Sequence, residues 1–528
     1  MATNQTKKLP NFRIEIQGDA EFKKSIQDRM QTVKNVLTAA RNKPATNGVI
    51  INELLIFWIK NHDDTARNDR KNVFQPSYVQ TEKNDTDQQT YVAAESSISN
   101  LCQLSAAHSK LCNGKLTVLK KTMKGHVISI RFQCNIDKSH GYLWSSSPYL
   151  PNNEYLVNHR VNHGYLCSGM LPSHYTRFSN GAGIGCIKKQ RRKFFFQNYK
   201  EVAEQVYKDS TQDALYAEIG TYEELDGINI VTDARHGWRK NAKDTSVVAI
   251  GENSHKVIDC VHVTKAQDPV SQRHEKFGTV KIYDHLAEQD VSIKVHSHDR
   301  NLSINKFVKD TRETTNQNDL WHAVKSLKKS INNISAGTKQ SEGWTWSEQL
   351  IDKTEPIATH VHWAIRHCEE DPVKLREYMD NIIPHYENNH SKCHPASRCK
   401  MDPNYEPSRI VLTSKHAKKL LDKTIKECVI YKYPQDYVLG KDTFYVESFN
   451  NVMNIFQDKR ISFGDDQYRF RSNLAVCHWN ENVDREFTSV HRPNNPNAPR
   501  NAKGKKVYKK QTFTYRSTIW KQFIETIY

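Results

Sequence analysis

The feature of this sequence that most constrains its fold is a run of strand-like segments leading from one aspartate to another. The segments are rich in β-branched and apolar residues, and polar or glycine-containing turns separate them. In order they are strands at 228–233, 245–250 and 256–263, a helix at 278–288 and a strand at 291–295. The first strand ends at Asp233, and Asp299 follows the last one. This order predicts three antiparallel strands, a crossover helix and a strand parallel to the first.

The two aspartates are expected to meet, because the first and last strands of such an arrangement lie side by side. Two carboxylates held together repel each other unless a cation lies between them. A single aspartate after a strand is usually a turn or helix-capping residue. That explanation is harder to apply to Asp233 and Asp299 together, with this strand order between them. The pair therefore predicts a site for divalent cations.

Length and charge indicate the class of protein and its partner. The 528 residues are enough for several domains at roughly 100–200 residues each. A formal net charge of +18 favours a polyanionic partner, most simply double-stranded DNA. Apolar runs stay well short of the roughly 18 residues of a membrane span, so we expect no membrane partner. Basic runs at 188–193 and 503–506 are compatible with import into the nucleus, although runs this short are more often solvated surface.

A first cluster of cysteines and histidines surrounds two strand-like runs at 115–120 and 126–133. Its members are Cys102, His108, Cys112, Cys134 and His140. The pattern outlines a zinc ribbon, for which Cys112, Cys134 and His140 are the candidate ligands. The cluster lacks a close CxxC pair, so buried free cysteines are the alternative. The irregular spacing of the eleven cysteines favours a reducing compartment over a disulfide framework.

A second cluster lies in the segment 331–440, which offers few large apolar residues and would need a cross-link. We predict a structural zinc here, bound by His360, Cys368, His385 and His390. His360 and Cys368 would share one helix face, since eight residues at about 3.6 per turn is close to an integral count. Cys393 and Cys399 are alternative ligands, and ordinary surface histidines are the alternative to a metal site.

Several short motifs occur in order along residues 101–490 and together resemble a known family. They are VTDARHGW, HSHDRNLSI, NDLWHAVKSLKK, THVHWAIRHC, TFYVESFNNV and YRFRSNLAVCHWNEN. In this order they resemble eukaryotic cut-and-paste DDE transposases of the Kolobok and Mutator-like kind. The resemblance implies an α/β fold: a ribonuclease-H-like mixed sheet interrupted by a helical insertion domain, preceded by a small zinc-ribbon-like module and a helical DNA-binding region.

The resemblance also assigns site residues. It implies Glu447 as the third catalytic carboxylate beside Asp233 and Asp299, and together they would hold two magnesium or manganese ions roughly 3.5–4 Å apart. It further implies an Asp-x-x-His pair formed by Asp319 and His322.

Four residues near the expected carboxylates are candidates for positioning DNA. They are Asp319, Trp321, His322 and Arg300. Trp321 and His322 could position DNA or a flipped base near the cut. A core histidine with satisfied hydrogen bonds is an equally good explanation for His322.

The expected organisation follows the chain in seven parts. They are 1–100 without an assigned role, a zinc-ribbon-like module at 101–145, a helical DNA-binding region at 146–225, the first part of the core at 226–330, a helical insertion domain at 331–440, the last core helix at 441–490 and a basic tail at 491–528. We expect a homo-oligomeric DNA transposase of the nucleus that cuts transposon ends and joins them to target DNA. A domesticated transposase acting as a DNA-binding regulator and a ribonuclease-H-like nuclease without strand transfer remain alternatives.

Overall fold

The computed structural model describes residues 90–224, 226–238, 242–310, 313–337, 347–492, 494–495, 497 and 504–528. The chain divides into two compact units, Met1–Gln88 and Gln89–Tyr528, and the described residues belong to the second. Most of the N-terminal region without an assigned role lies outside the described residues. Within the described part of the chain, no helix is both long and apolar enough to cross a membrane.

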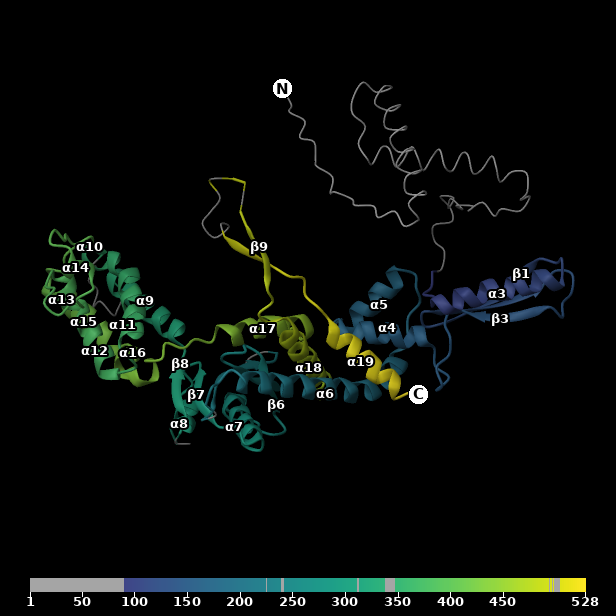
Figure 1. Cartoon of the computed structure of the whole chain (residues 1–528), viewed down its shortest axis with the longest axis horizontal. Coiled ribbons are helices and arrows are strands. Elements are labelled where there is room, and N and C mark those ends of the chain that lie inside the picture. The colour runs from purple at the N-terminus through teal and green to yellow at the C-terminus, as the bar shows by residue number, and fades with distance from the viewer. Residues whose placement is uncertain are drawn as a thin grey trace, which may run out of the picture. The chain divides into compact units, whose positions relative to one another are not determined.

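The second unit contains a mixed five-stranded sheet with helices around it, so the fold is α/β (Figure 1). The strands are β4 (Ile228–His236), β5 (Asp244–Gly251), β6 (Val257–Thr264), β7 (Ile293–His298) and β8 (Thr315–Asn318). Their order across the sheet is β6-β5-β4-β7-β8. Strands β4, β5 and β6 are antiparallel, whereas β7 is parallel to both β4 and β8. The predicted order of antiparallel strands, crossover helix and parallel strand is confirmed, with α7 (His274–Ala287) as the crossover.

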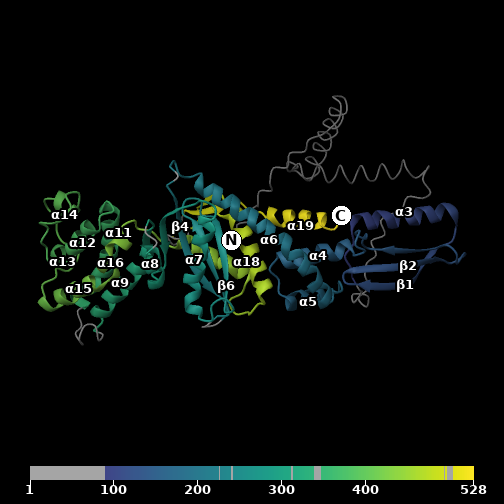
Figure 2. The ribbon, with the colours of Figure 1, turned by 90° about the horizontal axis from the view of Figure 1, so that it is seen from below.

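Helices cover both faces of this sheet (Figure 2). On β5, Val247 and Ala249 pack with Ile282 of α7, while Val248 and Ile250 share a core with the helices of the opposite face. These helices are α6 (Lys189–Ile219), α17 (Phe444–Phe456) and α18 (Asp465–Asn482). Burying one such side chain contributes about 1.5–3 kcal/mol, so β4 and β5 form a rigid support.

Between β8 and α17 the chain forms a helical part with a core of its own. Its helices are α9 (Leu320–Ser335), α10 (Ser347–Leu350), α11 (Thr354–His367), α12 (Pro372–Asp380), α13 (Ile382–Tyr386), α14 (Arg398–Met401), α15 (Lys415–Glu427) and α16 (Val429–Lys432). Buried residues such as Leu327, Val361 and Leu421 pack together. The expectation that 331–440 is too poor in apolar residues to form a core is therefore wrong, because helical spacing gathers its few Leu, Ile and Val residues on facing stripes.

A separate three-stranded antiparallel sheet comes before α6 in the chain. It contains β1 (Leu116–Lys124), β2 (Val127–Cys134) and β3 (Gly141–Ser145), and the helix α3 (Glu95–Leu111) comes before it. Its core is small, with Ile128, Ile130 and Trp144 at its centre. Helices α4 (Leu156–Cys167) and α5 (Pro172–Gly181) lead into α6.

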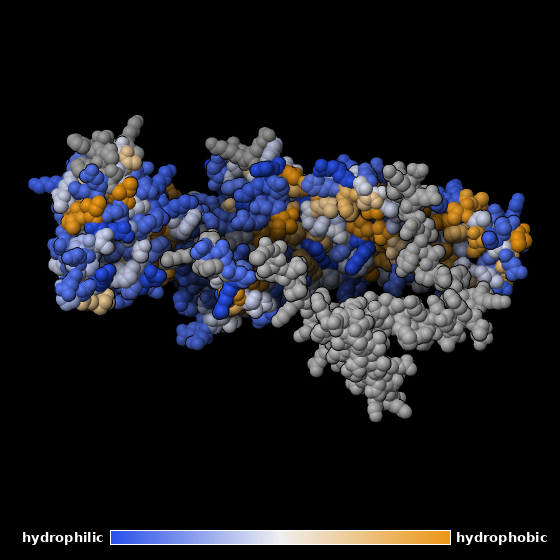
Figure 3. Space-filling model, turned by 90° about the horizontal axis from the view of Figure 1, so that it is seen from above, coloured by the Kyte–Doolittle hydropathy of each residue, from blue (hydrophilic) through white to orange (hydrophobic). Residues whose placement is uncertain are grey.

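The remaining elements are a short helix after β7 and the elements at the end of the chain. They are α8 (Leu302–Asp310), the antiparallel pair β9 (Phe487–His491) and β10 (Lys505–Tyr508), and α19 (Thr514–Glu525). Both strands of the pair are exposed along their length. The face drawn in Figure 3 is mainly hydrophilic, with smaller hydrophobic areas between.

Candidate metal centres

Asp233 is positioned by strand β4. Side chains alternate between the two faces of a strand, and Val231 shares a core with α17, so Asp233 faces the same side. Its Oδ2 accepts a hydrogen bond of 2.7 Å from Nδ2 of Asn450 on α17. Its Oδ1 accepts one of 2.7 Å from the N–H of Ala234. Strand and helix thus fix this carboxyl group from two sides.

Asp299 reaches the same level of the sheet through the register of two parallel strands. Thr232 of β4 pairs with His298 of β7, and the two aspartates are the next residues on either strand. The proximity of the two aspartates changes the pKa of Asp233. Burial, followed by the negative charge of Asp299, raises the pKa of Asp233 to about 7, and Glu275 and Glu447 act in the same direction.

Glu447 lies in the first turn of α17, between two residues that contact the aspartates. Residues three and four apart share one face of a helix. Thr443, four before Glu447, donates a hydrogen bond from Oγ1 to Asp319 Oδ2, and the same Oγ1 lies 3.4 Å from Asp299 Oδ1. Asn450, three after it, donates to Asp233. One helix face therefore connects all three predicted catalytic carboxylates.

Asp319 and His322 adjoin this acidic centre, which we define as Asp233, Asp299 and Glu447. Asp319 is the N-cap of α9, and its Oδ1 accepts a hydrogen bond of 2.8 Å from the N–H of His322. The imidazole Nδ1 lies 3.2 Å from Asp319 Oδ2 and 3.7 Å from Asp299 Oδ1, and Nε2 lies 3.7 Å from Glu447 Oε1. Burial alone would lower the pKa of His322, but these carboxylates raise it. The Asp-x-x-His spacing is thus a helix cap that holds an imidazole between two catalytic candidates.

Trp321 and Arg300, the other two positioning candidates, make no contact with the three carboxylates among the interactions of the described residues. Trp321 is about half exposed, and Lys325 Nζ lies 4.4 Å from the centroid of its ring. Arg300 is exposed and lies 5.8 Å from the ring centroid of Tyr433. Both side chains remain available to a ligand that approaches the acidic centre.

Glu275 is a carboxylate near this centre that the sequence did not reveal. It lies in the first turn of α7, and its Oε2 accepts a hydrogen bond of 2.7 Å from Asn301 Nδ2. Burial and the charge of Asp299 raise its pKa. An acidic residue at a helix start is common, so nothing in the sequence distinguished Glu275 from an ordinary residue of a first helical turn.

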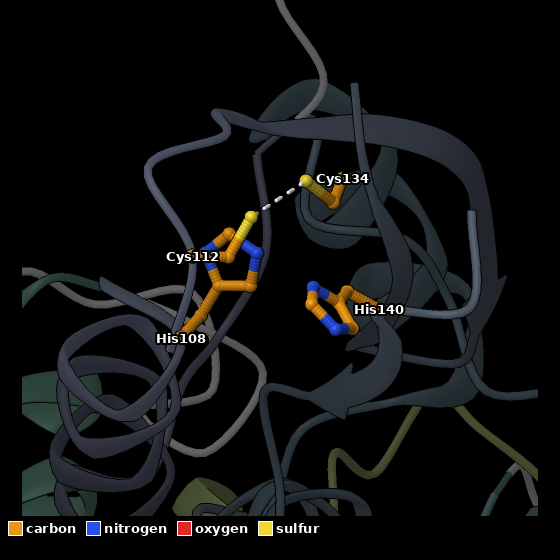
Figure 4. Close-up of side chains that lie close together, drawn as sticks. All are labelled: His108, Cys112, Cys134 and His140. Atoms are coloured by element: carbon orange, nitrogen blue, oxygen red, sulfur yellow. Dashed lines mark hydrogen bonds between the residues drawn. The ribbon is translucent and has the colours of Figure 1, made fainter. Parts of the chain in front are cut away.

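The first Cys/His group is formed by His108, Cys112, Cys134 and His140 (Figure 4). One ligand atom from each lies within 4.8 Å of all the others. The sulfur atoms of Cys112 and Cys134 are 3.8 Å apart. His108 Nε2 and His140 Nδ1 are buried without a hydrogen-bond partner. The three predicted ligands are brought together and His108 joins them, whereas Cys102, the other member of this cluster, is exposed and lies outside the group.

Backbone groups around this first group are arranged as in thiolate sites. Gly114 donates its N–H to Cys112 Sγ at 3.3 Å, and Ile136 donates to Cys134 Sγ at 3.4 Å. A hydrogen bond from the backbone of Asp137 lowers the pKa of Cys134. A Cβ atom on Gly114 would lie 2.3 Å from Cys134 Sγ, so this position requires glycine. The local fold favours a charged sulfur over a buried thiol.

The second Cys/His group is formed by His385, His390, Cys393 and Cys399. Two of its members are predicted ligands and two are the alternatives. The prediction for His360 and Cys368 is wrong, because neither belongs to the group. His360 Nε2 bonds the carbonyl oxygen of Tyr378 at 2.9 Å. Cys368 is fully buried and donates to the carbonyl of Ile365.

Comparison with known proteins does not decide the family. No protein-family model matches the chain, and no curated protein matches its sequence. The metal that each group could bind is therefore inferred from its ligand atoms. Oxygen ligands at the acidic centre suit hard cations such as magnesium or manganese, whereas two sulfur and two nitrogen ligands suit zinc.

Proposed function

We propose that the protein is a DDE transposase with a ribonuclease-H-like core, which cuts transposon ends and joins them to target DNA. The observation that supports this most strongly is the pairing of Thr232 with His298, because it places Asp233 and Asp299 side by side with α17 across them. This is the arrangement that a two-metal phosphoryl transfer site needs, since shared carboxylates must reach both ions.

The acidic centre fits divalent cations. Burial, followed by the negative charge of Asp299, raises the pKa of Asp233 to about 7, and a cation between these carboxylates would relieve their repulsion. Asp233, Asp299 and Glu447 would hold two magnesium or manganese ions, which supply an activated water or 3′-hydroxyl and stabilise the leaving oxygen. Asp319 fixes His322 between Asp299 and Glu447, where the imidazole orients both carboxylates. Trp321 and Arg300 are exposed to contact DNA.

Zinc is the metal we propose for the first Cys/His group, which would make 101–145 a zinc-ribbon-like module. The buried nitrogen atoms of His108 and His140 have no other partner, and leaving them unsatisfied would cost about 1–3 kcal/mol each. A structural zinc with four protein ligands removes that cost.

Double-stranded DNA is the proposed partner. Exposed basic residues lie at the start of α6 and on the β9–β10 pair, among them Lys189, Arg191, Lys193, Lys505 and Lys506. Binding should weaken steeply between about 50 and 200 mM salt, because phosphate contacts release counterions. A transposase would act in the nucleus and as a homo-oligomer, since two transposon ends are joined together.

Cleavage of DNA from the borders of the protein's own gene is the experiment that tests this function. We expect magnesium-dependent cuts at the element ends and, with added target DNA, joined products. Asp299→Asn should abolish both reactions, and Asp290→Asn, which neutralises an exposed aspartate near β7, should not. Cuts without joined products would favour a nuclease, and binding without cuts a domesticated regulator.

A further inference from the structure

The second Cys/His group lies in the helical part between β8 and α17, far along the chain from the acidic residues of β4 and β7. His385 belongs to α13 and Cys399 to α14, and His390 and Cys393 lie in the connection between these helices. One ligand atom from each residue lies within 4.8 Å of the other three. All four belong to residues 385–399, so one short segment of the chain supplies the whole group.

The distances within this group match a tetrahedron of ligands. Cys393 Sγ lies 3.5 Å from His385 Nδ1 and 3.7 Å from His390 Nδ1, and Cys399 Sγ lies 3.9 Å from His385 Nδ1. Metal–ligand bonds of about 2.0–2.3 Å at tetrahedral angles give edges of roughly 3.3–3.8 Å. The side chains therefore stand where zinc ligands stand, before any adjustment on binding.

Hydrogen bonds with neighbouring side chains orient two of the ligands, His390 and Cys393. Nε2 of His390 lies 2.9 Å from Asn388 Oδ1, so it carries the proton and leaves Nδ1 with its lone pair toward the group. Asn381 Nδ2 donates a hydrogen bond of 3.4 Å to Cys393 Sγ. Such second-layer contacts orient metal ligands and stabilise a thiolate.

The connection that carries these ligands contacts its surroundings through a few side chains: Glu387 pairs with Lys418, and His394 packs against Trp363 and Tyr378. Residues 387–397 lie between α13 and α14, and most of them are exposed or half-buried, while Cys393 is buried. Four residues of this connection, Cys393, His394, Ala396 and Ser397, line a cavity of about 640 Å³ together with Trp363, Tyr378 and Tyr405. A metal bound by the four ligands would fix this part of the connection to α13 and α14.

We propose that His385, His390, Cys393 and Cys399 bind one structural zinc ion. The site is closed, with four protein ligands and no position for substrate, and it binds the 387–399 connection to α13. Tetrahedral coordination by two sulfur and two nitrogen atoms selects zinc over magnesium or calcium. This inference does not depend on the proposed function, because the site would stabilise the helical part in any protein that contains it.

Zinc analysis of the purified full chain tests the site. The chain should hold two zinc ions, and Cys393→Ser with Cys399→Ser should hold one. Cys428→Ser is the matched control, since Cys428 lies in the same helical part but outside the group, and it should keep both. Cys112→Ser should lose the other ion, so the two sites are counted separately.

A ligand exchange separates loss of zinc from failure to fold. His390→Ala should lose the zinc of this site, whereas His390→Cys should retain it, because a thiolate can replace an imidazole at zinc. Cobalt substitution should give a sulfur-to-cobalt charge-transfer band that weakens in Cys393→Ser. The inference is overturned if the double cysteine variant holds as much zinc as the wild type, or if His390→Cys loses it as His390→Ala does.

Discussion

The first Cys/His group gathers four ligand atoms, whereas at the acidic centre the atoms that lie within 4.8 Å of one another belong to Asp299, Asp319 and His322. The two regions also differ in exposure. The side chains of Asp299 and Glu447 are 47% and 50% exposed. Cys134 is 3% exposed, and the free nitrogen atoms of His108 and His140 are buried. The carboxylates of Asp299 and Glu447 are thus open to solvent, whereas the Cys/His group buries Cys134 and one ring nitrogen of each histidine.

Because of this difference we propose a catalytic role for the acidic centre and a structural role for the first Cys/His group. A catalytic metal must keep positions for substrate and water, whereas a structural metal is surrounded by protein ligands. The acidic centre also rests on a rigid sheet with two covered faces, so the cations there are not needed for folding. The module of β1, β2 and β3 has a small core, and its fold would depend on the metal.

The largest expected effect is on catalysis at the acidic centre. Asp233→Asn, Asp299→Asn or Glu447→Gln should lower the rate of DNA cleavage by roughly 10³-fold or more, because in the proposed site each residue would hold a reacting metal. DNA affinity and zinc content should stay at the wild-type level. Cleavage rates and filter binding measure the two quantities, with Asp290→Asn as the control. Full activity of any of the three variants would remove that residue from the centre.

The next largest effect concerns the closed group. Cys112→Ser should remove one zinc ion and unfold the segment 95–145, since apparent binding energies of structural zinc are of the order of 10 kcal/mol. Hydrogen exchange should rise in that segment and stay unchanged in β4 and β5. Cys102→Ser, an exposed cysteine outside the group, should change neither zinc content nor exchange. A Cys112→Ser protein that keeps its zinc would contradict the ligand set.

A smaller effect is expected for the residue that orients the carboxylates. His322→Gln should reduce cleavage about 10- to 100-fold and raise the magnesium concentration needed for half-maximal rate, because second-layer contacts tune metal affinity by that factor. His174→Gln, which changes an exposed histidine of α5, should behave as wild type. An unchanged magnesium dependence would mean that His322 is only part of the local packing.

The smallest effect is a pH dependence confined to the acidic centre. The folded pKa of Asp233 is raised to about 7, above the ordinary value of 3.8. Its contribution to stability is therefore present at low pH and is lost as the pH rises through about 7. In buffer without magnesium, the Tm of wild type should fall more than that of Asp233→Asn between pH 5 and pH 8, which is about the range over which this group titrates. Magnesium should raise the wild-type Tm more at the higher pH, and equal slopes for the two proteins would contradict this assignment.

The sequence predicted the parts of the molecule that depend on local pattern and strand order. The buried run at 245–250 is apolar enough to be recognised as a central strand, and β5 is indeed buried throughout. From strand order alone, Asp233 and Asp299 could be expected at adjoining strands, and their register now places them at one level. The strand β3 was missed, because its burial is confined largely to Trp144.

Ligand sets that depend on packing between elements were predicted less well. His360 and Cys368 have suitable spacing on α11, but a backbone carbonyl occupies the first and the helical core encloses the second. His108 enters its group because α3 lies against the small sheet, which no spacing within the chain discloses. Glu275 similarly becomes visible only when α7 packs on the sheet.

The most direct test of the difference between the open and the closed sites is anomalous diffraction from crystals grown with manganese. We expect two manganese peaks roughly 3.5–4 Å apart at Asp233, Asp299 and Glu447. We also expect zinc, without manganese, among His108, Cys112, Cys134 and His140. A map with manganese absent from the three carboxylates, although the ion is present at millimolar concentration, would contradict the central claim that they form a two-metal site.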